Sequence, residues 1–166
     1  LEDILSLKGR LLKDKALRVK NGECGEACTT YARRSVRAYE KAFAATGGYY
    51  SGINVATMSL LGERSARTVK EKAKAVMAIL LDKLTQNSLA QNLSGTSGNE
   101  ETYYIEATRA EALLLMGHKH QAGQSLQAAV LHDPLNFTAH ATTLKQLRLI
   151  LEVRGENADW LGPFSP

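Results

Sequence analysis

Several features that mark specialised protein classes are scarce in this sequence. No apolar run approaches the roughly 18 residues that a membrane-spanning helix needs. Two cysteines in 166 residues are too few for a disulfide-dense scaffold, and aromatic residues make up only 6% of the chain. The hydrophobic fraction of 44% is nevertheless too high for a disordered chain. These absences leave a globular domain of ordinary composition, and we expect no contact with a membrane.

We expect the chain to be a piece of a longer protein. It opens on Leu1-Glu2-Asp3 without an initiator methionine. Its first 20 residues mix acids and bases among the apolar positions, which is not the pattern of a signal peptide. We therefore interpret the sequence as an excised domain, and a regulatory fragment whose effector enzyme lies elsewhere is one alternative.

Catalytic motifs are also missing. The sequence has no Gly-x-Ser-x-Gly nucleophile elbow and no phosphate-binding glycine loop. The string Gly95-Thr96-Ser97-Gly98 lacks the lysine and the preceding strand of such a loop, so it is typical of a linker. Glu106 and Glu111 are five residues apart and do not face each other on a helix. We predict no enzyme, no catalytic residue and no cofactor.

The cysteines and histidines are weak candidates for a metal site. Cys24 and Cys28 are spaced i, i+4 and would share a helix face, but no further ligand lies nearby in sequence. A strained disulfide is an alternative, and reduced structural thiols in a cytoplasmic protein are the reading we favour. His118 and His120 fall in a turn, where solvated side chains are expected more often than metal ligands. We predict no metal.

Charge is distributed unevenly along the chain. Residues 1–84 hold 16 Lys/Arg and 9 Asp/Glu, a net of +7, whereas residues 85–166 hold 5 and 8, a net of −3. A solvated helix face explains most such patterns, but a basic half can also attract nucleic acid or an acidic partner. Opposite signs in the two halves also suggest head-to-tail self-association. The cations that would serve a nucleic-acid or acidic-partner site are Arg33, Arg34, Arg37, Lys70, Lys72 and Lys74.

Apolar periodicity predicts an all-α protein with no strand. The stripe of residues 52–61, with apolar residues at i, i+3, i+4, i+7 and i+8, is that of a buried helix face, and Gly62 follows as a C-terminal cap. In the first helix Ile4, Leu7, Leu11 and Leu12 form the apolar stripe. Seven helices are expected, over residues 2–19, 26–46, 52–61, 64–85, 101–116, 119–132 and 134–153.

The regions between and after these helices complete the predicted organisation. Gln86 to Asn99 is polar and predicts a flexible loop of about 14 residues, which is long for a globular domain. Asp133 is a candidate N-cap with Pro134 at the first helical position. We expect one helical-repeat domain over residues 1–155 and a tail over 156–166 whose aromatic residues pack back on the last helix.

One window has the spacing of a tetratricopeptide repeat. From Gly117 to Asn136 the order is glycine, a small residue at 122, a large one at 126, alanine at 129, then Asp-Pro. Small residues at these positions let paired helices approach closely, and the proline ends one helix and starts the next. We predict a tetratricopeptide-like stack of antiparallel helix pairs, with a generic antiparallel bundle as the alternative.

Four segments in order carry a family resemblance. They are Gly9–Asp14 (GRLLKD), Tyr39–Phe43 (YEKAF), Tyr49–Thr57 (YYSGINVAT) and Gln146–Ile150 (QLRLI). Together they resemble the TRAFs-binding domain of the apoptosis signal-regulating MAP kinase kinase kinases, which also occurs in bacterial tetratricopeptide proteins. The resemblance implies an all-helical regulatory scaffold that holds partner proteins or controls an attached effector. In the most specific string, we expect the Tyr pair to fasten the start of the helix and Gly52 to let the backbone approach a neighbour.

The expected activity is protein binding on a helical-repeat surface. Stacked helix pairs form a concave surface lined by the first helix of each pair, and such surfaces commonly bind partner segments. We leave the apolar stripes for packing and take the polar residues of those helices as candidates for binding a protein or peptide. They are Arg10, Lys13, Asn54, Met58, Ser59, Thr108, Arg109 and Glu111.

Overall fold

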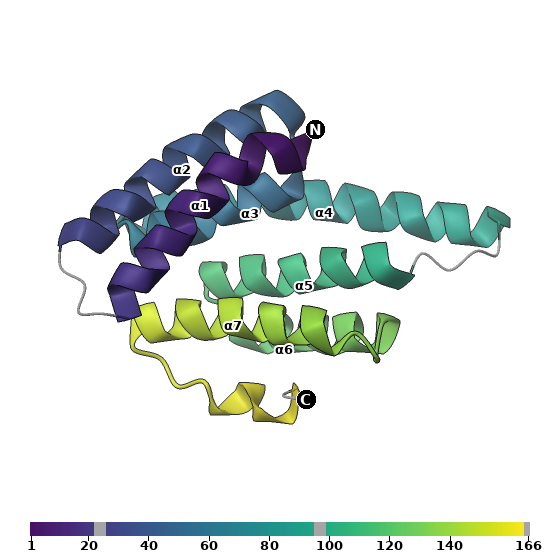
Figure 1. Ribbon diagram of the computed structural model, residues 1–166. Coiled ribbons are helices and arrows are strands. Elements are labelled where there is room, and N and C mark those ends of the chain that lie inside the picture. Colours follow the sequence, from purple (N-terminus) through teal and green to yellow (C-terminus); the bar gives the residue numbers. More distant parts are fainter. Residues whose placement is uncertain (22–25, 95–98, 165–166) are drawn as a thin grey trace. The chain divides into compact units, whose positions relative to one another are not determined.

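A computed structural model describes residues 1–21, 26–94 and 99–164 (Figure 1). The chain divides into two compact units, residues 1–76 and residues 77–166, and each is described by itself. Within the described ranges all regular secondary structure is helical, with no strand, and the helices pack in adjacent pairs. The all-α prediction is confirmed.

Unit 1 contains α1 (Glu2–Asn21), α2 (Glu26–Thr46), α3 (Tyr49–Leu61) and the beginning of α4 (Ala66–Ser94). Helix α1 packs along α2, and α2 packs on α3 (Figure 1). The α1–α2 contact is close because small residues line it. The hydroxyl of Ser35 donates to the carbonyl of Gly9 at 2.8 Å, and the ring of Tyr39 lies directly over Gly9.

The apolar stripe of α1 faces solvent, although the sequence analysis predicted that it is buried. Ile4, Leu7 and Leu11 were expected in the core, yet they are 74%, 50% and 57% exposed. The buried face of α1 instead carries Ser6, Gly9 and Ala16. The prediction was wrong because the Tyr39 ring leaves no room for a large side chain between the two helices. The leucines of α1 therefore face outward.

Helix α3 is fastened at both ends by residues of other helices. The Glu2 carboxylate accepts from the backbone N–H and the hydroxyl of Ser51, at 2.7 and 2.6 Å. A carboxylate suits a helix N-terminus, where unpaired N–H groups carry positive partial charge. At the other end, Gly62 is the C-cap, as predicted, and its carbonyl accepts from Arg33 Nε at 3.1 Å. The helix begins at Tyr49, three residues before the predicted start.

The predicted loop over residues 86–99 is mostly helix. Helix α4 continues to Ser94 and α5 begins at Asn99, while residues 95–98 lie outside the described residues. The hydroxyls of Thr85 and Ser88 donate to carbonyls one turn earlier, at 2.9 Å each, which fits a polar sequence into a helix. The loop prediction was wrong because polarity marks an exposed helix as well as a loop, and Leu89 is 59% exposed here.

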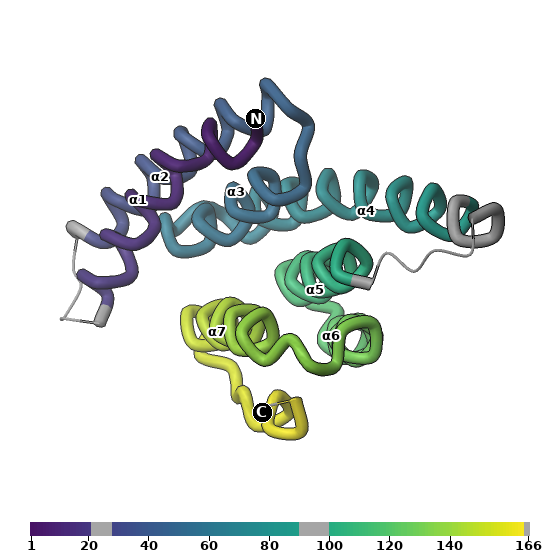
Figure 2. The backbone as a smooth tube through the Cα atoms, turned by 45° about the vertical axis from the view of Figure 1, so that its right-hand side comes forward, coloured from purple at the N-terminus to yellow at the C-terminus, as the bar shows by residue number. Residues whose placement is uncertain are grey.

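Unit 2 contains the rest of α4, then α5 (Asn99–Met116), α6 (Lys119–His132), α7 (Phe137–Arg154) and the 3-10 helix η1 (Asp159–Phe164). Figure 2 shows α5, α6 and α7 gathered side by side. The predicted repeat positions Ala122, Leu126 and Ala129 are buried. Arg154 of α7 donates to the carbonyls of Leu114 and Leu115 at 2.6 Å each, which satisfies the open end of α5.

Two details of the C-terminal part differ from the sequence analysis. Helix α7 begins at Phe137, because the Asn136 side chain caps it by accepting from the Ala139 N–H at 3.2 Å, so Asp133–Pro134 belongs to the preceding turn. The tail packs back as expected, with Leu161 fully buried, but Trp160 contacts Gly123 and Lys119 of α6. None of the described helices is both long and apolar enough to cross a membrane.

Candidate functional site

Residues from α1 and α3 meet on one side of unit 1 and form a polar surface. Lys13 Nζ donates to Asn54 Oδ1 at 2.7 Å, and Asn54 Nδ2 donates to the Tyr50 carbonyl at 2.8 Å. The Arg10 guanidinium lies over the Tyr50 ring, 5.8 Å from its centre. We call Arg10, Lys13, Tyr50 and Asn54 the α1–α3 face. It brings together three of the residues predicted to bind a partner, although they are up to 44 positions apart in sequence.

The buried side chain of Tyr39 packs against this face from the interior of unit 1. Tyr39 of α2 is fully buried, and its ring meets that of Tyr50 edge-on with 6.3 Å between centres. Burial, and then the neighbouring Tyr50, raises the pKa of the Tyr39 hydroxyl far above its usual value of 10.0. The hydroxyl is buried without a hydrogen-bond partner. Tyr39 therefore stays neutral, and its ring packs against Tyr50, over which Arg10 lies.

Of the two cations of the face, Arg10 is exposed and Lys13 is half-buried. The Arg10 side chain is 47% exposed, and its ion pair with Asp3 is long, 3.8 Å, on a carboxylate that is itself 88% exposed. Such surface pairs contribute little and exchange readily. Unit 1 as a whole holds 15 Lys/Arg and 8 Asp/Glu, a net charge of +7. The face can therefore donate hydrogen bonds to carbonyl or carboxylate oxygens, with an aromatic ring beside them.

Two further predicted binding residues, besides the buried Asn54, are inside the protein. Met58 and Ser59 of α3 are both 0% exposed, so neither side chain is available to a partner. Their assignment was wrong because α3 is buried on every side: all residues from Ser51 to Ser59 are buried. The sequence analysis assigned only the apolar stripe of this helix to the core. A helix that is surrounded on all sides also buries its other residues, including Met58 and Ser59.

The other predicted residues lie on α5 of unit 2 and are partly exposed. Arg109 Nη1 pairs with Glu106 Oε2 at 3.3 Å, and the Ser125 hydroxyl donates to the same oxygen at 2.5 Å. Arg109 therefore compensates a carboxylate that is only 7% exposed, which is a structural role. Thr108 and Glu111 are half-buried on the same helix. The sequence analysis compared Glu106 with Glu111 only and missed its pairing with Arg109, which the i, i+3 spacing could have indicated.

A hollow on another side of unit 1 was not expected from the sequence. It lies between α2, α3 and α4 and has a volume of about 400 Å³. Phe43, Val55 and Ala75 form its apolar wall. On its rim Lys72 Nζ donates to Glu40 Oε1 at 2.7 Å, so Lys72 serves the fold as well as the basic surface to which the sequence assigned it.

Other candidate chemistry is sparse in the part of the chain that the structure describes. There, no three His, Cys, Asp or Glu side chains lie close enough together to hold a metal ion. Cys28 is a free, buried thiol, and Cys24 lies outside the described residues. Of the cations named for an acidic or nucleic-acid partner, Arg33 bonds the Gly62 carbonyl, whereas Arg34, Arg37, Lys70 and Lys74 are exposed.

Comparison with known proteins bears on unit 1. Residues 1–59 match the model of a family described as Tetratricopeptide Repeats-Sensor. Comparisons with curated proteins and with solved structures give no match. The match covers the α1–α3 face completely and confirms a tetratricopeptide-like sequence in this segment, but it is not a match to the TRAFs-binding domain in particular.

Proposed function

We propose that unit 1 binds a segment of a partner protein on the α1–α3 face and acts as the regulatory scaffold of a signalling protein. Tetratricopeptide-like repeats bind proteins in general, which is the coarse function that the match over residues 1–59 indicates. The likeness to the TRAFs-binding domain and the word sensor in the matched family's description both favour a regulatory role.

One observation carries the proposal. The sequence predicts Arg10, Lys13 and Asn54 as binding residues, and in the structure they converge on one surface through the Lys13–Asn54 bond of 2.7 Å. Asn54 is only 5% exposed, so it positions the Lys13 ammonium and does not itself meet the partner. The Arg10 guanidinium is likewise positioned by a neighbour, because it stacks over the Tyr50 ring. Two cations fixed by neighbours lose less side-chain entropy on binding than free surface lysines and arginines.

The expected ligand is an extended segment that presents oxygen atoms. A backbone carbonyl or an acidic side chain accepts from Lys13 and Arg10, and an apolar or aromatic side chain packs on the Tyr50 ring. Hydrogen bonds to charged groups contribute about 1.5–3 kcal/mol each. Losing both cations should therefore weaken binding by at least about a hundredfold.

A peptide selection tests this. A phage-displayed library of random dodecapeptides is selected on the intact chain, and the recovered peptides are labelled and titrated by fluorescence anisotropy. We expect peptides whose affinity falls at least about a hundredfold for the double variant Arg10→Ala/Lys13→Ala. The matched control is Lys8→Ala/Arg18→Ala, which removes one lysine and one arginine from exposed positions of the same helix.

The control separates a site from a general attraction. If both double variants weaken binding equally, the peptides respond to net charge alone, and the α1–α3 face is not a site. If no selected peptide depends on Arg10 and Lys13, the proposal is wrong. Salt dependence gives a second readout, because a specific contact keeps a residual affinity at high ionic strength that a steering effect loses.

A further inference from the structure

The hollow between α2, α3 and α4 has the size and lining of a binding cleft. We call it the α2–α4 cleft. Its volume of about 400 Å³ lies within the range of ligand pockets, which starts near 300 Å³. Phe43, Val55 and Ala75 make its wall apolar, while Glu40, Thr68, Glu71 and Lys72 place polar groups around the rim. An apolar interior with few polar groups at its edge is typical of sites that bind a side chain.

The cleft is built into the packing of unit 1. Gly52 of α3 borders it, and a Cβ atom there would lie 2.9 Å from Val76 Cγ2 and 3.0 Å from Phe43 Cε2. Only glycine allows the three helices to approach this closely, as the sequence analysis expected of this position. Val55 is 3% exposed, and the Glu40–Lys72 ion pair joins α2 to α4 across the rim. A preformed cleft binds with little ordering cost.

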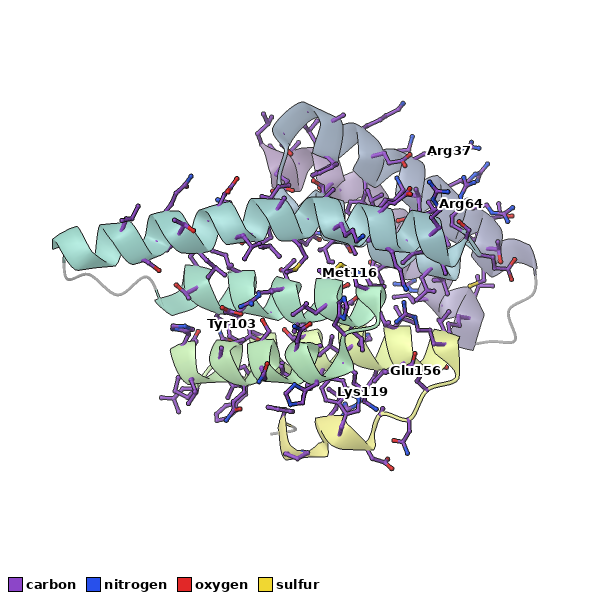
Figure 3. All side chains as sticks on the ribbon, turned by 180° about the vertical axis from the view of Figure 1, so that it is seen from behind. Arg37, Arg64, Tyr103, Met116, Lys119 and Glu156 are labelled. Atoms are coloured by element: carbon purple, nitrogen blue, oxygen red, sulfur yellow. The ribbon has the colours of Figure 1, made fainter. Side chains whose placement is uncertain are left out.

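Exposed arginines lie on α2 and in the turn that joins α3 to α4. The bond from Arg33 Nε to the Gly62 carbonyl places α2 against the turn that joins α3 to α4. Arg37, one turn further along α2 and three residues before the rim residue Glu40, is exposed. Arg64 in that turn is also exposed, and Figure 3 labels both arginines at this end of unit 1.

We propose that the α2–α4 cleft binds a short acidic peptide segment of a partner protein. A large apolar side chain such as Leu or Phe enters the cleft, and adjacent Asp or Glu residues bind Arg37 and Arg64. Backbone N–H groups of the peptide donate to the rim carboxylates of Glu40 and Glu71. A peptide offers both the apolar side chain that the wall accommodates and the N–H groups that the rim carboxylates can accept, whereas the phosphate backbone of nucleic acid offers neither.

This inference rests on the proposal that unit 1 binds proteins, but it uses a different surface. On α3, Gly52 and Val55 lie on the side of the helix opposite to Tyr50 and Asn54, as 100° per residue requires. Peptides that bind the cleft and peptides that bind the α1–α3 face therefore respond to different substitutions. The failure of one proposal is distinguishable from the failure of the other.

The test uses the intact chain and the same library of random dodecapeptides. Ala75 is an exposed residue of the cleft wall, so Ala75→Trp fills the cleft from outside. We expect one class of selected peptides to pair a large apolar residue with Asp or Glu, and to lose at least about tenfold in affinity to this variant. Ala45→Trp, at an exposed position of α2 that does not line the cleft, is the matched control and should change affinity less than about twofold.

Charge reversal tests the acidic character. Arg37→Glu should weaken the same peptides at least about tenfold, whereas Lys8→Glu, with the same change in net charge at an exposed position of α1, should leave them within about twofold. Arg10→Ala/Lys13→Ala should not affect them. If Ala75→Trp disturbs folding, Ala75→Glu serves instead, since it repels an acidic ligand without adding bulk.

Three results would overturn the proposal. One is a set of selected peptides that bind Ala75→Trp as tightly as the unchanged chain. Another is a consensus without acidic residues. The third is displacement of the peptides by random-sequence DNA in a manner that depends on Arg37, which would assign the arginines to nucleic acid.

Discussion

The contact between Gly9 and Tyr39 makes a prediction whose sign can be worked out from the structure. A Cβ atom added at Gly9 would lie 2.8–2.9 Å from three atoms of the Tyr39 ring. In an open helix, Gly→Ala stabilises by about 1 kcal/mol, because alanine has the higher helix propensity. Overpacking a filled core costs about 1–3 kcal/mol. The ring is fully buried and cannot move aside, so the overpacking cost outweighs the gain in helix propensity, and we expect Gly9→Ala to destabilise unit 1 by up to about 2 kcal/mol net.

Gly123 provides the matched control. It also lies inside a helix, α6, but its added Cβ would be 3.6 Å from the nearest atom of Trp160, an ordinary van der Waals contact. Gly123→Ala should therefore stabilise unit 2 by about 1 kcal/mol. The same substitution in two helices thus has opposite predicted effects, and the difference comes from one aromatic ring.

Urea unfolding followed by two probes measures both effects. Trp160 is the only tryptophan and its fluorescence reports on unit 2, while hydrogen exchange of α1 and α2 amides reports on unit 1. Gly9→Ala should reduce α1 protection and leave the Trp160 transition unchanged. In a double-mutant cycle with Tyr39→Leu, the cost of Gly9→Ala should shrink by about 1 kcal/mol or more. If Gly9→Ala stabilises α1, the close α1–α2 contact is refuted.

Three further predictions concern stability. Arg154→Met removes two hydrogen bonds to the end of α5, and urea unfolding should show unit 2 destabilised by about 2–4 kcal/mol. Leu7→Gln should change the stability of unit 1 by less than about 0.5 kcal/mol, because Leu7 is half exposed; a cost above about 2 kcal/mol would show that the stripe is buried. The pKa of the Tyr39 hydroxyl is raised in the folded chain, so neutral Tyr39 contributes to the free energy of unfolding. This contribution is complete below the usual pKa of 10.0 and is lost as the pH rises above it. Tyr39→Phe should therefore reduce the loss of stability above about pH 10, as measured by urea midpoints across the alkaline range.

Much of the fold could be predicted from local pattern. Helices α2 and α6 have the bounds that the sequence predicts, and glycines at 62 and 117 follow helix ends where expected. Helix boundaries differ from the predicted ones where side chains of other helices cap the helix. Glu2 caps α3 from another helix, and Gly48 leaves room for its carboxylate, so the helix starts earlier than its own sequence indicates.

The orientation of α1 could not be predicted, because it depends on a residue in another helix. Its sequence offers an apolar stripe and a small-residue stripe on opposite sides, and standard amphipathicity favours burying the first. Tyr39 lies flat over Gly9 and selects the second. A pattern of small residues in a helix is a signal of close helix contact, and here it outweighs hydrophobicity.

The candidate site was predicted in part for similar reasons. Arg10, Lys13 and Asn54 were found because polar residues were assigned to the first helix of each pair, and α1 and α3 do meet along that side. Met58 and Ser59 failed because burial of α3 on all sides is a tertiary property. The α2–α4 cleft could not be predicted from the sequence, since its wall brings together residues of three helices that are far apart in sequence.

Protein binding on the α1–α3 face is the central claim, and an amide chemical-shift titration of the isotope-labelled chain with a selected dodecapeptide tests it most directly. The largest shifts should fall on residues 9–14 of α1 and 50–55 of α3, and they should vanish for Arg10→Ala/Lys13→Ala at the same peptide concentration. Shifts confined to α2, α4 or unit 2, or shifts that persist in that variant, would contradict it.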